Sequence, residues 1–227
     1  MTQAMAAHPG PDEPLAIALA DLNERLGLGM SSAQTDALLG FVALLGRWNT
    51  TYNLTAVREP MQMLTQHLAD CLAVVPALRR QLGAAQTPRL LDVGSGGGLP
   101  GVVLAVLHES AQVTCVDTVG KKAAFVRQVA VELGLRKLHA QHARVEQMVA
   151  PAPFDVVTSR AFASLLDFTT LTRRHLSAGG VWMAMKGKRP DDELAALPND
   201  VEVFHVEPLD VPGLAAERCL VWMRLRH

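Results

Sequence analysis

Cysteine, aromatic residues and long apolar runs are scarce in this chain, and these scarcities exclude several protein classes. The three cysteines, Cys71, Cys115 and Cys219, are odd in number and far apart. This distribution argues against a disulfide framework or a cysteine-based zinc site, so no metal is expected, and it fits a reducing cytoplasm. Apolar stretches such as 38–45 and 102–107 are too short and too interrupted to span a bilayer, so no membrane partner is expected.

The chain also lacks an excess of charge of either sign. Its 21 Lys and Arg face 22 Asp and Glu, which gives a formal net charge of −1. The chain as a whole therefore does not attract nucleic acid, and an RNA partner would need a local basic face. Basic clusters at 121–127, 173–174 and 186–189 could supply that face, although each also reads as ordinary solvated surface charge.

Composition and patterning predict a soluble protein with one main domain. Hydrophobic residues make up 49% of the chain and charged residues 19%, which is ordinary for a globular protein of 227 residues. Residues 1–13 lack the basic start and long apolar segment of a signal peptide, so we interpret them as a flexible leader. We expect a helical extension over 14–87 and an α/β domain over 88–227, packed as one unit.

The first third of the chain carries apolar residues at helical spacing. The pattern predicts helices over 14–26, over about 32–48 and over 60–75, with a polar loop at 49–58. Ser31 or Ser32 can cap the second helix, and Pro60 suits the first turn of the third.

After Pro88 the pattern changes to short apolar runs separated by helical segments. Strands are predicted at 89–93, 112–117, about 137–141, 154–158, 181–185, 201–206 and 219–224, and helices at 100–107, 121–133 and 165–175. The alternation predicts a doubly wound, mostly parallel seven-stranded sheet with helices on both faces, and the last two strands predict an antiparallel hairpin at one edge.

The glycine-rich segment 90–101, LLDVGSGGGLPG, is the strongest local motif. An apolar strand ends at Asp92, glycines form a turn, and a helix begins near Pro100, so the backbone can approach a ligand closely. Residues 96–101 also satisfy the dinucleotide fingerprint GxGxxG. A carboxylate at Asp92 would repel a pyrophosphate but could favour the cationic amino-acid end of S-adenosylmethionine. We therefore favour S-adenosylmethionine over a dinucleotide or a purely structural turn.

Two further carboxylates follow predicted strands. Asp117 ends the second strand, where a carboxylate can accept hydrogen bonds from the ribose hydroxyls of either cofactor, or cap the next helix. Glu146 follows the third strand and could accept from an adenine amine, although by itself it reads as a surface helix residue.

Several segments, taken in order, resemble the glucose-inhibited division protein B family, ribosomal RNA small subunit methyltransferase G. The matching segments are 53–57 with His67 and Asp70, 92–101, 117–122, 144–146, 159–163 and 185–187. Asn-Leu-Thr-Ala at 53–56 and Ser-Arg-Ala-Phe-Ala at 159–163 are the most specific of them. Thr118-Val119, Lys122 and 219–222 depart mildly from the family pattern, away from the expected cofactor contacts.

The resemblance implies a class I methyltransferase fold and methylation of guanine N7 at one site of 16S ribosomal RNA, within the small subunit or an assembly intermediate. By position, cofactor contacts are expected at Gly94, Leu99, Asp117, Val145, Glu146 and Arg160. Substrate contacts are expected at Asn53, His67, Arg160 and Lys186. His67 and Asn53 could equally serve a hydrogen bond between helix and loop, and Lys186 could be a solvated lysine.

The methyl transfer that the resemblance implies needs few catalytic groups. Guanine N7 has a lone pair and no proton to lose, so direct in-line attack on the sulfonium methyl group requires alignment and no general base or metal. Two alternatives stay open: a class I methyltransferase acting on another RNA, a protein or a small molecule, and an NAD-dependent oxidoreductase. Asp92 disfavours the second, and so does the single tyrosine, Tyr52, outside the sheet domain. We expect a cytoplasmic monomer.

Overall fold

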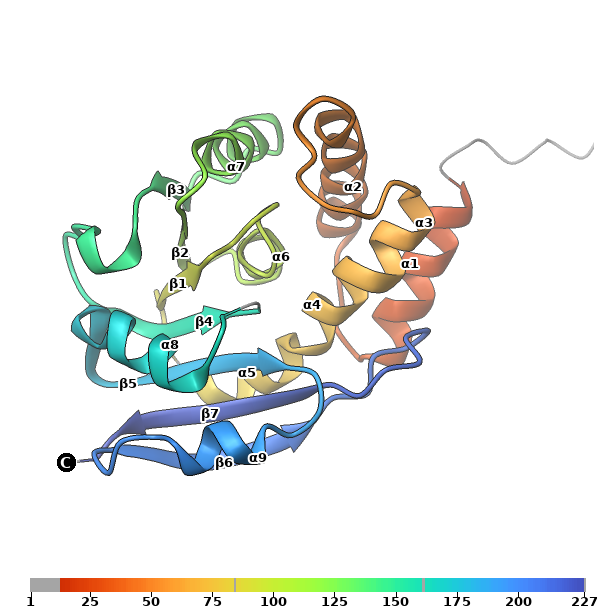
Figure 1. Cartoon of the computed structure of the whole chain (residues 1–227). Helices are drawn as coiled ribbons and strands as arrows, with labels where there is room; N and C mark the ends of the chain where they lie inside the picture. The colour runs from red at the N-terminus through yellow and green to blue at the C-terminus, as the bar shows by residue number, and fades with distance from the viewer. Residues whose placement is uncertain (1–12, 84, 161, 227) are drawn as a thin grey trace, which may run out of the picture.

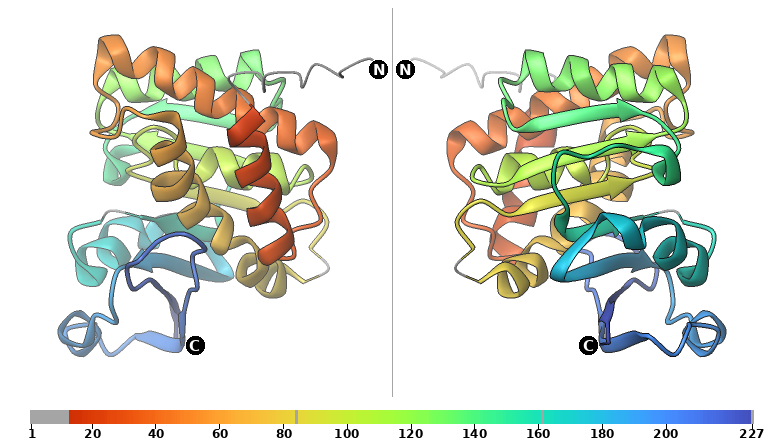
Figure 2. Two further views of the ribbon diagram at one scale, coloured as in Figure 1. Left: turned by 90° about the vertical axis from the view of Figure 1, so that its right-hand side faces the viewer. Right: turned by 90° about the vertical axis from the view of Figure 1, so that its left-hand side faces the viewer.

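A seven-stranded sheet covered by helices on both faces forms the centre of the molecule (Figures 1 and 2). The computed structural model describes residues 13–83, 85–160 and 162–226. The predicted leader lies outside these residues except for Glu13, which begins helix α1. None of the described helices is both long and apolar enough to cross a membrane.

The sheet has the strand order β3-β2-β1-β4-β5-β7-β6. The strands are β1 (Arg89–Val93), β2 (Gln112–Asp117), β3 (Leu138–His142), β4 (Phe154–Ser159), β5 (Leu176–Lys186), β6 (Val201–Pro208) and β7 (Cys219–Leu225). β1 to β5 are parallel, and β7 is antiparallel to both β5 and β6. The predicted seven-stranded sheet and its antiparallel edge pair are therefore confirmed.

Strand β5 begins five residues earlier than the sequence predicts, at Leu176 instead of Val181. Gly179 and Gly180, which directly precede the predicted start, lie inside the strand, where the register with β4 shifts between Phe154 and Val156. A Cβ atom at Gly180 would lie 2.9 Å from the carbonyl oxygen of Phe154. Glycine here therefore permits close contact between the strands and does not end one.

Helix α1 (Glu13–Arg25) matches the prediction, and α2 (Ser32–Tyr52) has the expected cap at Ser31, which forms a capping box with Gln34. α2 continues four residues beyond the predicted end, so the assignment of 49–52 to the loop was wrong. Asn49 is buried, and its side chain accepts from the amide of Thr55 at 2.9 Å and donates to the carbonyl of Val57 at 2.9 Å. Its polarity suggested a loop, but it serves to hold the following loop against the helix.

The predicted third helix is divided into shorter segments. It consists of α3 (Pro60–Met63), a π-helical turn over Leu64–Leu68 and α4 (Ala69–Ala73), and it leads into α5 (Val75–Leu82), which the sequence did not predict. π-helical turns frequently occur at functional sites, and this one carries His67.

Alternate residues of the central strands pack into different hydrophobic clusters. Leu90 of β1 packs with the N-terminal helices, α6 (Gly101–Leu107) and α7 (Gly120–Glu132), whereas Leu91 packs with α8 (Leu165–Thr172). The residues 165–175 were predicted as one helix, and they end in a 3₁₀ turn over Arg173–His175. A short helix that was not predicted, α9 (Asp191–Ala195), lies beside α8.

Candidate active site

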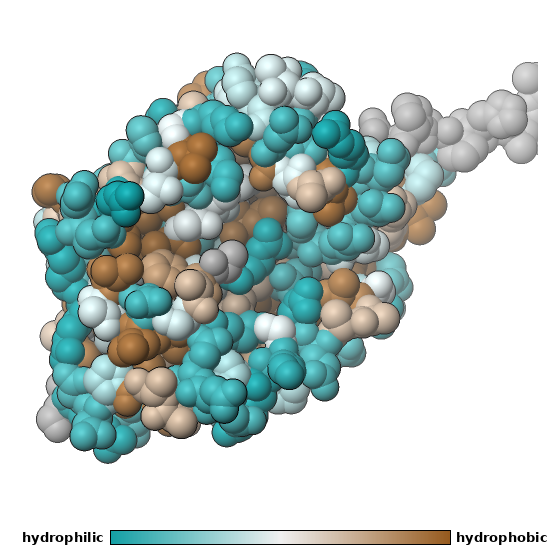
Figure 3. Space-filling view, in the orientation of Figure 1, coloured by the Kyte–Doolittle hydropathy of each residue, from teal (hydrophilic) through white to brown (hydrophobic). Residues whose placement is uncertain are grey.

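The strand order places two predicted site residues at the point where the sheet changes direction. From β1 the chain proceeds to β2 and β3 on one side and to β4 and β5 on the other. In open parallel sheets, ligands bind beyond the carboxyl ends of the strands at such a point. Gly94 directly follows β1 and Arg160 directly follows β4, so they flank it. The face seen in Figure 1 is hollowed in the middle, with apolar residues in the hollow and hydrophilic residues around it (Figure 3).

The glycine loop has the backbone conformation that glycine permits. Gly94, Gly96 and Gly98 have φ values of 69°, 58° and 84°, in the left-handed region that residues with a side chain rarely adopt. Gly94 is exposed, and its amide donates to the carbonyl of Val116 at 2.8 Å. Leu99 is buried in the core, so its contact with a cofactor stays a prediction.

Asp92 lies beneath this loop and is almost fully buried. Its Oδ2 accepts from the amide of Gly101 at 2.8 Å, and its Oδ1 has no hydrogen-bond partner among the described residues. Burial raises the pKa of Asp92 to about 7, while the hydrogen bond from Gly101 opposes the shift. The carboxylate therefore anchors the loop through Oδ2, whereas the buried Oδ1 has no partner, and a contact with the cationic end of a ligand stays a prediction.

Close packing at Gly101 gives a first testable prediction. A Cβ atom there would collide with Sγ of Cys115 and lie 2.9 Å from Oδ2 of Asp92. We expect Gly101→Ala to lower the free energy of unfolding by about 2–3 kcal/mol, measured by urea denaturation, because overpacking displaces the loop. Gly46→Ala is the matched control, since a Cβ at this helical position meets nothing within 4 Å.

Adding Cys115→Ala to the Gly101 variant removes the sulfur and should restore part of the lost stability. If the Gly101 and Gly46 variants were equally stable, the close packing of the loop on Cys115 would be contradicted.

Asp117 connects the loop to the start of α7. Its Oδ2 accepts from the amide of Gly96 at 2.9 Å, and its Oδ1 accepts from the amide of Val119 at 2.8 Å. Each oxygen retains a second lone pair. The structure thus gives Asp117 a role in shaping the loop, and its contact with ribose hydroxyls stays a prediction.

Val145 and Glu146 lie in a 3₁₀ turn over Val145–Gln147. The carbonyl of Val145 is 2.7 Å from Nε2 of His175, and the carbonyl of Glu146 accepts from Arg174 at 3.0 Å. The Glu146 side chain is partly exposed and lies 3.8 Å from Arg144. Hydrogen bonds from His175 and Arg174 therefore hold this turn, and the sequence pattern did not predict these contacts. The contact of Glu146 with adenine stays a prediction.

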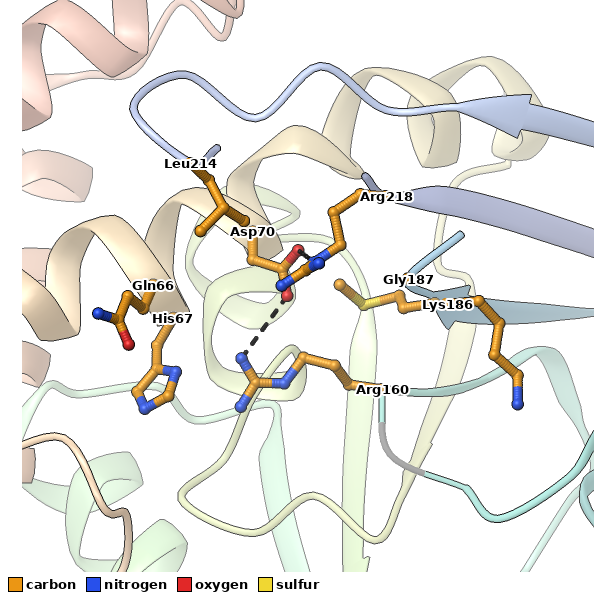
Figure 4. Close-up of a pocket in the computed structure, with 9 residues that line it drawn as sticks. Gln66, His67, Asp70, Arg160, Lys186, Gly187, Leu214 and Arg218 are labelled. Atoms are coloured by element: carbon orange, nitrogen blue, oxygen red, sulfur yellow. Dashed lines mark hydrogen bonds and ion pairs between the residues drawn. The ribbon is translucent and has the colours of Figure 1, made fainter. Parts of the chain in front are cut away.

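A cavity of about 510 Å³ opens beside Arg160 (Figure 4). It is lined by Gln66, His67, Asp70, Arg160, Met185, Lys186, Gly187, Leu214 and Arg218. The structure thus brings together three of the four residues expected to contact the substrate, and it leaves out Asn53. Arg218 was missed because it comes from the chain before β7, and no local motif marks it.

Asp70 pairs with two arginines at the wall of this cavity. Its Oδ1 accepts from Nε of Arg218 at 3.0 Å, and its Oδ2 lies 3.8 Å from Nη1 of Arg160. The carboxylate side chain is 5% exposed, whereas the two guanidinium side chains are 28% and 26% exposed. A buried anion therefore holds two partly exposed cations that come from distant parts of the chain.

His67 and Asn53 form hydrogen bonds with residues of the loop before α3. His67 Nε2 lies 2.7 Å from Oγ1 of Thr55, and the pKa of His67 is lowered first by burial and then by the charge of Arg160. Both effects favour the neutral ring, which suits the hydrogen bond between helix and loop. Asn53 ends α2 with φ 50° and accepts from Arg58 at 3.4 Å. Direct contact of either residue with RNA stays a prediction.

Lys186 ends β5, but its ammonium group already has a partner. Its Nζ lies 2.8 and 3.0 Å from the two carboxylate oxygens of Glu193 in α9, and the side chain is 14% exposed. In Figure 4 the ammonium group points away from Asp70 and Arg160. A contact with RNA phosphate, which stays a prediction, would have to compete with Glu193.

Comparison with known proteins agrees with this geometry. The profile of the family described as rRNA small subunit methyltransferase G matches residues 34–221. A protein of Methylibium petroleiphilum named ribosomal RNA small subunit methyltransferase G is 59% identical over 219 residues, covering 96% of this chain and 98% of its own. A protein of the same name from Leptothrix cholodnii is 61% identical over 203 residues, covering 89% and 92%.

The fold is shared with solved methyltransferases. The glycopeptide N-methyltransferase MtfA, in complex with S-adenosylmethionine, superimposes with a TM-score of 0.56 at 13% identity, covering 70% of this chain and 94% of its own. The predicted Rossmann-like class I methyltransferase fold is therefore confirmed, and the oxidoreductase alternative is excluded by the family match. The chain belongs to the rRNA small subunit methyltransferase G family.

Proposed function

We propose that this protein transfers the methyl group of S-adenosylmethionine to N7 of one guanine in 16S ribosomal RNA. It acts in the cytoplasm, as a monomer, on the small subunit or an assembly intermediate. The observation that carries the proposal is the position of the glycine loop and the arginine-lined cavity on the two sides of the switch between β1 and β4. Membership of the methyltransferase family supports the substrate class.

The residues beyond β1 and β2 fit S-adenosylmethionine. Gly94 is exposed with positive φ, so a ligand can approach its backbone without meeting a Cβ atom. The unpartnered Oδ1 of Asp92 suits the cationic amino-acid end, and Asp117 suits the ribose. The remaining part of the cofactor site would be lined by Leu99, Val145 and Glu146. Arg160 would lie at the boundary between the cofactor and the substrate.

When bound, the cofactor supplies an electrophilic methyl group on a sulfonium centre. The protein's own task is alignment, because guanine N7 attacks through a free lone pair and releases no proton. Holding the two reactants in line can supply roughly 7–11 kcal/mol of the barrier reduction. Arg160, next to the loop and at the wall of the cavity, is placed to fix the target nucleotide relative to the cofactor.

The test is a methyl-transfer assay with labelled S-adenosylmethionine and small ribosomal subunits from a strain that lacks the gene. We expect label at a single guanine N7 of the 16S RNA. If the protein binds the cofactor but labels a protein or another RNA, the substrate assignment is wrong and the fold assignment stands. If protein-free 16S RNA is labelled as fast as the subunit, the proposed preference for the assembled particle is wrong.

A further inference from the structure

The Asp70 ion cluster leaves positive charge at the cavity. One carboxylate serves both Arg160 and Arg218, whereas Lys186 has its own partner in Glu193. The three residues Arg160, Asp70 and Arg218 therefore carry one net positive charge. A single phosphodiester, with one negative charge, complements this surplus.

Arg218 has unused hydrogen-bond donors. Its Nε donates to Asp70 at 3.0 Å and its Nη1 to the carbonyl of Glu217 at 2.8 Å, while Nη2 makes no hydrogen bond with the described residues. Two of the three guanidinium nitrogens are therefore held by the protein, and Nη2 is free to donate. Arginine presented in this way binds phosphate oxygens in a planar, directed manner.

Arg218 also lies between two cavities. It lines the cavity of Asp70 and a second one of about 470 Å³, to which Lys188 and Arg189 contribute. A strand that places one base in the first cavity could pass Arg218 and continue along these basic residues. The position suits a backbone contact more than a contact with the base.

We propose that Arg218, positioned by Asp70, binds a backbone phosphate of the RNA strand next to the target guanosine. This inference rests on the proposed function and adds one RNA-binding residue and one positioning residue to it. Asp70 acts through the arginines, because it is 5% exposed and has both oxygens directed at guanidinium groups.

The test compares Arg218→Gln with Arg224→Gln in methyl transfer to small subunits at several salt concentrations. Arg224 is the matched control because it lies on β7 and is paired with a carboxylate, Glu202, at 2.7 Å. We expect Arg218→Gln to raise KM for subunits about tenfold, with a smaller effect on kcat. The slope of log kcat/KM against log salt should become shallower by about 1, as for one lost phosphate contact.

Two further variants separate RNA binding from a structural role. Arg218→Lys keeps the charge and should retain the salt slope of the unmodified protein. Asp70→Asn should raise KM by itself, and adding Arg218→Gln to it should raise KM by less than the product of the two effects. Cofactor affinity of each variant is measured to verify that the fold persists.

If Arg218→Gln has the KM and the salt slope of Arg224→Gln, the inference is overturned. It is overturned equally if Arg218→Gln loses cofactor binding together with its thermal stability, because Arg218 would then be a structural clamp. Failure of the unmodified protein to label subunit RNA would instead overturn the proposed function.

Discussion

Replacement of Arg160 by alanine is expected to lower kcat/KM for methyl transfer by about 100-fold or more. Arg160 follows β4 at the switch of the sheet, lines the cavity and lies 3.8 Å from Asp70. A reaction that depends on alignment loses about this factor when a reactant is misplaced by roughly 1 Å. The loss corresponds to about 2.7 kcal/mol of transition-state stabilisation.

The measurement is single-turnover methyl transfer to small subunits, together with cofactor affinity and thermal unfolding. Arg173→Ala is the control, because Arg173 forms an exposed ion pair with Asp200 and precedes β5 at the other end of the strand. Arg160→Lys keeps the charge without the planar fork and should give an intermediate rate. If Arg160→Ala kept full activity, Arg160 would have no part in alignment.

The second large expected effect is on the pH dependence of the free energy of unfolding. Asp92→Asn should remove the part of that dependence that Asp92 causes. Burial raises the pKa of Asp92 from 3.8 to about 7 in the folded protein. Between these values the folded state holds a proton that the unfolded state has released, so the free energy of unfolding falls as pH rises. This loss in the free energy of unfolding is absent below the pKa of Asp92 in the unfolded state. It is complete above the pKa in the folded state, where it reaches about 4 kcal/mol.

Urea denaturation of both proteins from pH 5 to pH 8 measures this effect. The stability of the unmodified protein relative to Asp92→Asn should fall by about 3 kcal/mol across the range. All other titrating groups are shared, so the difference isolates Asp92. Parallel curves would show that Asp92 keeps its charge on folding, contrary to the expectation from its burial.

Patterns along the chain determined much of the fold and one half of the candidate site. Strand β1, the glycine loop and Asp92 are contiguous, and their meaning depends on local backbone freedom and on the order of apolar and acidic residues. Asp117 follows from the same pattern on the next strand. The family resemblance added Arg160, Val145 and Glu146, and their contacts with the cofactor stay predictions.

Other features depended on packing that no local pattern reports. The polar Asn49 appeared to end a helix, yet it is buried and satisfied by the backbone of the next loop. Gly179 and Gly180 directly precede the predicted start of a strand at 181, yet they lie within β5 at a register shift. Hydrogen bonds to the next loop accommodate Asn49 inside a helix, and close contact between strands accommodates Gly180 inside a strand. Both residue types by themselves favour a loop.

The sequence by itself determined the βαβ order, the position of the glycine loop and the family. Only the tertiary structure joined Asp70 to Arg160 and to Arg218, which lies 148 residues farther along the chain, and only it paired Lys186 with Glu193. Ion pairs between distant segments depend on where folding brings their elements together. A single sequence records the charges but not their partners.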